Sequence, residues 1–157
     1  TQAHRLLGNN LVVRGRRVAI MKPRVPHART RDAIENTVTD QFDEIQQLEQ
    51  EYRTVEGVSR KDTVGYALAR VCNQYAWLVG NTFGDFKLAV KLSHRSLDLR
   101  KDSPGYLDTL GRCYYAADDL ENAIKYQKQA VELDLDSQQM RRQLKMFETA
   151  LKEKEAK

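Results

Sequence analysis

The sequence predicts an all-α protein, an α–α superhelix of antiparallel helix hairpins, preceded by a short basic segment that is extended or forms a hairpin. Three observations support this. Apolar residues recur every three or four positions from about Asp32 onward. The stretch Gly84–Leu99 is echoed 34 residues later by Asp118–Leu133, and a fixed period of this size indicates stacked two-helix units. Residues 1–31 carry eight basic side chains and no acidic one.

The N-terminal segment, residues 1–30, differs in pattern from the rest of the chain. Its residues 11–21 are rich in β-branched side chains around Gly15 and fit a small hairpin. Pro23 and Pro26 then interrupt regular structure. The alternative is a linker or the end of an upstream domain, because the chain begins with Thr1 and we expect it to be a piece of a longer protein.

The basic segment is followed directly by an acidic stretch. Residues 32–56 carry eight acidic side chains and one basic side chain, so we expect the two stretches to fold together. Pairing with a second subunit, or contact with nucleic acid or an anionic surface, are the alternatives. Nucleic acid is the least favoured, because residues 1–31 contain no aromatic ring on which a base could stack.

Six amphipathic helices are predicted between Asp32 and the C-terminus. The first ends before Gly57, and the second begins near Ser59, which resembles a capping box with Asp62. The six apolar stripes are, in order, Ile34, Val38, Phe42, Ile45, Leu48 and Tyr52; Val64, Leu68, Val71, Tyr75 and Leu78; Phe86, Ala89, Val90, Leu92 and Leu97; Leu107, Leu110 and Tyr114; Leu120, Ala123, Ile124, Ala130 and Val131; and Met140, Leu144, Phe147 and Leu151.

The later helices have clear start signals. Ser103 is the expected N-cap of the fourth helix, with Pro104 at its first position, where the missing N–H has no cost. Asp118 and Asp119 form the turn before the fifth helix, where carboxylates are favoured by the helix dipole. The last helix is capped by Asp136 or Ser137, and its polar far side is typical of an end cap.

The second hairpin, residues 104–137, resembles a tetratricopeptide repeat (TPR). Its residues Leu107, Leu110, Gly111, Tyr114, Leu120, Ala123 and Ala130 occupy the large and small packing positions of that family. We expect Gly111 and Ala123 to mark the close crossing of two helices, where only small side chains fit. Gln127 stands where an aromatic residue is common, and Leu135 where proline is usual.

The first hairpin, residues 70–102, matches the family less regularly. Its second helix aligns through Phe86 and Ala89, but its first helix aligns only if the register slips by one residue, which places Tyr75 and Ala76 at the large and small positions. The run N-x-x-A-W that ends at Trp77 resembles divergent bacterial repeats of this family. The resemblance implies a helical domain over 31–157, with a capping helix at 138–154. Two repeats leave an apolar end, which we expect residues 32–60 or a second subunit to cover.

No constellation of residues indicates an enzyme, a cofactor or a metal site. The three histidines lie in unrelated contexts, and the sequence contains no phosphate-binding loop, dinucleotide fingerprint or nucleophile motif. Cys72 and Cys113 have no metal-ligand spacing, and we expect two buried free thiols. Trp77 lies among apolar residues, so we expect it in the core rather than at a ligand. The residues assign no compartment.

Function is therefore expected at a surface. The resemblance implies that the first helix of each hairpin lines a groove for a peptide or partner helix. The candidate partner-binding residues are Gln74, Leu78, Asn81, Asp108, Arg112, Tyr115 and Arg142, those of the first hairpin being uncertain by one residue. Gln74 and Leu78 stand where the family's carboxylate clamp would need Lys and Asn, so the sequence does not support that clamp.

Three functions are consistent with these features. The favoured one is a protein–protein interaction module within a larger multidomain protein, with a protein or peptide partner and with a homo-oligomer as a possible assembly. The second is an adaptor whose basic arm contacts nucleic acid or an anionic surface. The third is an accessory domain of an enzyme whose catalytic part lies upstream.

Overall fold

The computed structural model describes residues 28–156, and every regular element in that range is an α-helix. The elements are α3 (Ala28–Thr54), α4 (Val58–Asn81), α5 (Phe86–Leu99), α6 (Pro104–Ala116), α7 (Leu120–Leu133) and α8 (Gln138–Glu155). The all-α prediction is thus confirmed for this range. The predicted N-terminal hairpin lies outside the described residues. No helix in 28–156 is both long and apolar enough to span a bilayer.

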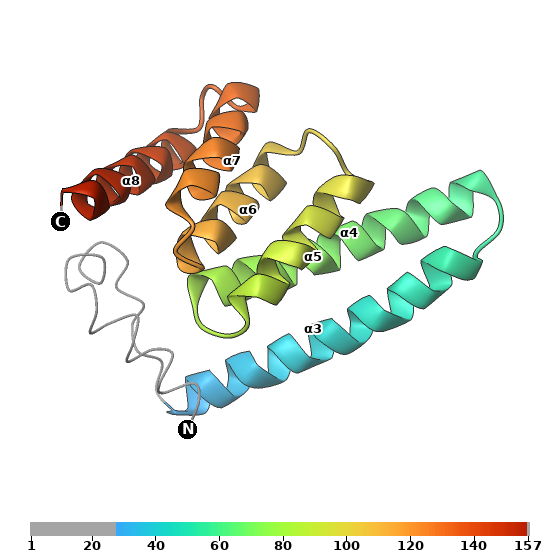
Figure 1. Ribbon diagram of the computed structural model, residues 1–157. Helices are drawn as coiled ribbons and strands as arrows, with labels where there is room; N and C mark the ends of the chain where they lie inside the picture. The colour runs from blue at the N-terminus through green and yellow to red at the C-terminus, as the bar shows by residue number, and fades with distance from the viewer. Residues whose placement is uncertain (1–27, 157) are drawn as a thin grey trace.

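The helices pack in chain order, from α3 at one end of the molecule to α8 at the other (Figure 1). Each of α3, α4, α5, α6 and α7 packs against the helix that follows it, and α4 also packs against α6. Helix α3 therefore covers the outer side of the first hairpin, as expected for residues 32–60. Ile45 of α3 is buried in the same apolar cluster as Leu68 and Tyr75 of α4.

The predicted close crossing of α6 and α7 is confirmed. A Cβ atom added to Gly111 would lie 2.8 Å from Gln127 Oε1 and 3.1 Å from the carbonyl oxygen of Ala123. Both Ala123 and Ala130 are fully buried. Small residues at these places therefore allow the two helix backbones to approach closely.

Burial along α4 follows the slipped register. Cys72, Tyr75, Ala76 and Val79 are all buried, whereas Asn73 is half-buried. The expectation that Trp77 belongs to the core is wrong, because 55 % of its surface is exposed. The one-residue shift in register moves Trp77 from the buried side of α4 to the side that α3, α5 and α6 leave open.

The start signals were predicted with mixed success. Asp119 caps α7 and Ser137 caps α8, each accepting a hydrogen bond from a backbone N–H of the first turn. Ser103 is the N-cap of α6 but its side chain makes no capping bond. The capping box at Ser59 is wrong: the N-cap of α4 is Gly57, two residues earlier, whose φ of 88° suits glycine. Asp62 pairs instead with Arg100.

Candidate functional site

The strongest surface feature of the described residues is a stripe along α4 that no other helix covers. Tyr66, Arg70, Asn73 and Trp77 follow one another at spacings of four, three and four residues, so they share one face of the helix. Tyr66 is 56 % exposed and Trp77 is 55 % exposed, and Arg70 is exposed as well. We call these four residues the α4 face.

Arg70 is the exposed polar residue of the α4 face. Arg70 makes no hydrogen bond or ion pair with any residue of the described range. The side-chain oxygen of Asn73 is buried and has no hydrogen-bond partner there either. A buried acceptor without a donor costs about 1–3 kcal/mol.

One end of the α4 face is bordered by the turn between α5 and α6. The guanidinium of Arg100 lies 5.1 Å from the centre of the Tyr66 ring and forms an ion pair with Asp62 at 3.2 Å. Tyr106 of α6 lies close by: burial raises the pKa of its phenol, nearby Tyr66 raises it further, and Arg100 and Arg70 lower it. The Tyr66 ring is therefore held in place by a cation–π contact while much of it stays open to solvent.

The predicted residues of the second hairpin lie together, in a polar network inside the domain. The Oδ1 atom of Asp108 accepts hydrogen bonds from Gln127 Nε2 at 2.7 Å and from Gln143 Nε2 at 3.0 Å. Arg112 donates to Gln143 Oε1, and Gln143 Nε2 also donates to Gln127 Oε1 at 3.0 Å. The network joins α6, α7 and α8, and it satisfies the side chain of the fully buried Gln127.

Burial sets the electrostatics of this network. Desolvation raises the pKa of Asp108, although the hydrogen bond from Gln127 and the charge of Arg112 lower it. Desolvation likewise lowers the pKa of Arg112, while Asp108 raises it. A buried polar network of this kind stabilises one arrangement of its helices when every member is satisfied. Asp108 and Arg112 are therefore engaged within the fold.

The other predicted residues are scattered. The Tyr115 ring is buried and stacks on Phe147, with 4.6 Å between ring centres. Arg142 is exposed on α8 and donates to Gln138 of its own helix at 3.3 Å. Gln74 is exposed, Leu78 is half-buried, and Asn81 donates to the carbonyl oxygen of Trp77 at 2.7 Å. Gln74 and Leu78 each come one position after a member of the α4 face. The sequence analysis left the register of this hairpin uncertain by that one residue.

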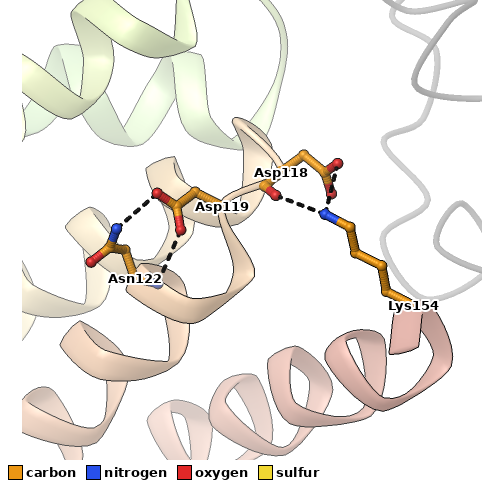
Figure 2. A network of polar contacts seen from close by, with 4 residues as sticks. All are labelled: Asp118, Asp119, Asn122 and Lys154. Carbon is orange, nitrogen blue, oxygen red and sulfur yellow. Dashed lines mark hydrogen bonds and ion pairs between the residues drawn. The ribbon is translucent and has the colours of Figure 1, made fainter. Parts of the chain in front are cut away.

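The paired carboxylates of the α6–α7 turn have structural partners. Asp119 accepts from the backbone N–H of Asn122 at 3.1 Å and from its side-chain amide at 2.8 Å, while Asp118 accepts from Lys154 Nζ at 3.4 Å (Figure 2). An open hollow of about 460 Å³ adjoins them, between this turn and the end of α8. The pair thus caps α7 and ties α8 to the turn.

Neither a protein-family model nor a curated protein matches the sequence. Within residues 28–156, no group of three or more His, Cys, Asp or Glu side chains is placed to hold a metal ion. The α4 face was missed in the sequence because Trp77 has apolar neighbours. The slipped register was the available signal, since it moves Asn73 and Trp77 onto the open side of the helix.

Proposed function

We propose that this chain is a TPR-like protein-interaction module that binds a peptide or partner helix on the α4 face. The observation that carries the proposal is the exposure of Trp77 and Tyr66 on one helix face, with Arg70 between them. Trp, Tyr and Arg are the residue types that contribute most to binding energy in protein interfaces. A single exposed apolar residue is ordinary on a protein surface, but two large aromatic rings aligned with a guanidinium that has no partner in residues 28–156 are not.

The packing supports the TPR-like part of the proposal. Helix α4 packs on α5, α6 packs on α7, and α4 and α6 pack on each other, as stacked two-helix units do. The small residues at the α6–α7 crossing and the slipped register of α4 agree with the residue positions of that family. In such a stack the first helices of the hairpins, α4 and α6, share the binding side.

Site-specific photo-cross-linking tests the proposal. A photoreactive residue at Gln74, exposed beside the α4 face, is compared with one at Leu135, which is 64 % exposed in the turn between α7 and α8. In an extract of the cells that make the protein, we expect a discrete cross-linked protein from position 74, lost on Trp77→Ala, and none from position 135. The same products from both positions, or a product that survives Trp77→Ala, would refute the proposal.

A further inference from the structure

The charges of the helices that share the proposed binding side point to the chemistry of the partner. Helices α4 and α6 together carry four Arg and Lys side chains and two Asp side chains. The only acidic residue of α4, Asp62, is paired with Arg100. The only acidic residue of α6, Asp108, accepts hydrogen bonds from two glutamine amides. The charge available at the α4 face is therefore that of Arg70, which is positive and unpaired within the described residues.

We propose that the partner is an acidic peptide segment that lies along the α4 face, with one carboxylate on Arg70 and an apolar or aromatic side chain against Trp77. This inference rests on the proposed function and specifies its partner. A guanidinium binds a carboxylate through two parallel hydrogen bonds, which gives both strength and orientation. The indole of Trp77 offers a rigid apolar surface on the same helix face, about 10 Å from Arg70 along the helix axis.

The length of the α4 face sets the length of the peptide segment that it can hold. Tyr66 and Trp77 are eleven residues apart, or roughly 16 Å along the helix. About five residues of extended peptide span that distance.

A nucleic acid fits this face less well. Single strands bind through successive bases stacked on aromatic rings and through many phosphate contacts. Tyr66 and Trp77 stand too far apart for neighbouring bases, and Arg70 is the one unpaired cation of the four-residue stripe. The test therefore includes single-stranded DNA as a competing ligand.

Trp77 is the only tryptophan of the chain, so its fluorescence reports on this face alone. The full chain is titrated with a ten-residue peptide of Glu and Ser with one central Phe, with its Gln and Lys counterparts, and with random-sequence single-stranded DNA. Binding is also measured by anisotropy of the labelled peptides. Arg70→Gln is compared with Arg60→Gln, which removes an exposed arginine of the same helix outside the stripe.

We expect the Glu peptide to shift Trp77 emission to the blue and to bind at least about tenfold more tightly than the Gln peptide. Arg70→Gln lowers that affinity about tenfold, while Arg60→Gln leaves it within about twofold. If Arg70→Gln leaves the affinity for the Glu peptide unchanged, the inference is wrong, because the basic residues 1–31 would then account for the binding. Tighter binding of the DNA overturns it too.

The two proposals fail in different ways. If the Gln or Lys peptide shifts Trp77 emission as strongly as the Glu peptide, the α4 face still binds peptides but the acidic partner is wrong. If no peptide changes the emission and position 74 cross-links to nothing, the α4 face is not a binding surface and both proposals fail.

Discussion

Replacing Gly111 with alanine adds one methyl group at the close crossing of α6 and α7. The new Cβ would lie 2.8 Å from Gln127 Oε1, 3.1 Å from the carbonyl oxygen of Ala123 and 3.4 Å from the backbone nitrogen of Gln127. The Ala123 contact is to backbone, which cannot rotate away. The Gln127 side chain is fully buried and is held by its bonds to Asp108 and Gln143.

The expected cost follows from these contacts. Overpacking of a well-packed crossing costs about 1–3 kcal/mol, and displacement of Gln127 from one hydrogen bond costs about 1 kcal/mol more. The higher helix propensity of alanine offsets about 1 kcal/mol. Gly111→Ala should therefore lower the free energy of unfolding by about 1–3 kcal/mol, with a fall in Tm of roughly 3–5 °C for each kcal/mol at this domain size.

Gly105 provides the matched control within the same helix. It lies in the first turn of α6, is exposed, and an added Cβ would meet no atom within 4 Å. Gly105→Ala should be neutral or stabilise the domain by up to about 1 kcal/mol. Both variants are followed by urea and thermal unfolding with circular dichroism. Equal stability of the two variants would refute the close crossing of α6 and α7.

Three further outcomes are expected. Trp77→Ala should cost less than about 1 kcal/mol in urea unfolding, against about 3–5 kcal/mol for a core tryptophan, and iodide should quench native Trp77 readily; a buried emission spectrum would contradict its placement. Burial lowers the pKa of His94, so the unfolded chain binds the proton more tightly and stability should fall as pH drops through about 6.5. His94→Gln should flatten that slope between pH 7.5 and 5.5, and an unchanged slope would count against a buried neutral imidazole. Burial raises the pKa of both Cys72 and Cys113 to about 12, so neither thiol should react with iodoacetamide at pH 8 until urea unfolds the domain; fast native alkylation would disprove this.

Much of the fold could be predicted from the sequence, because helix packing requires a local pattern of apolar and small residues. The apolar stripes and the small residues Gly111 and Ala123 encode which sides of α6 and α7 meet, and both were predicted. The α4 face was not. The neighbours of Trp77 are apolar whether the ring is buried or exposed, so only the packing of α4 against α6 decides which side of the helix stays open.

The polar network shows a second limit of sequence reasoning. Asp108 and Arg112 were placed on a groove by repeat position, but Gln127 comes close to Asp108 only when α7 packs on α6, and Gln143 joins them only when α8 packs. No local pattern indicates that two glutamine amides will bind one aspartate. The signal in the sequence was Gln127, a polar residue where the resemblance predicted an aromatic one.

The most direct test of the α4 face as the binding surface is to map the bound acidic peptide by NMR on the full-length, isotope-labelled chain. We predict that the largest chemical-shift changes fall on the Trp77 indole N–H, the Asn73 side-chain amide and the backbone of residues 66–81. Changes confined to residues 1–27, or to the outer surfaces of α5 and α7, would contradict that assignment.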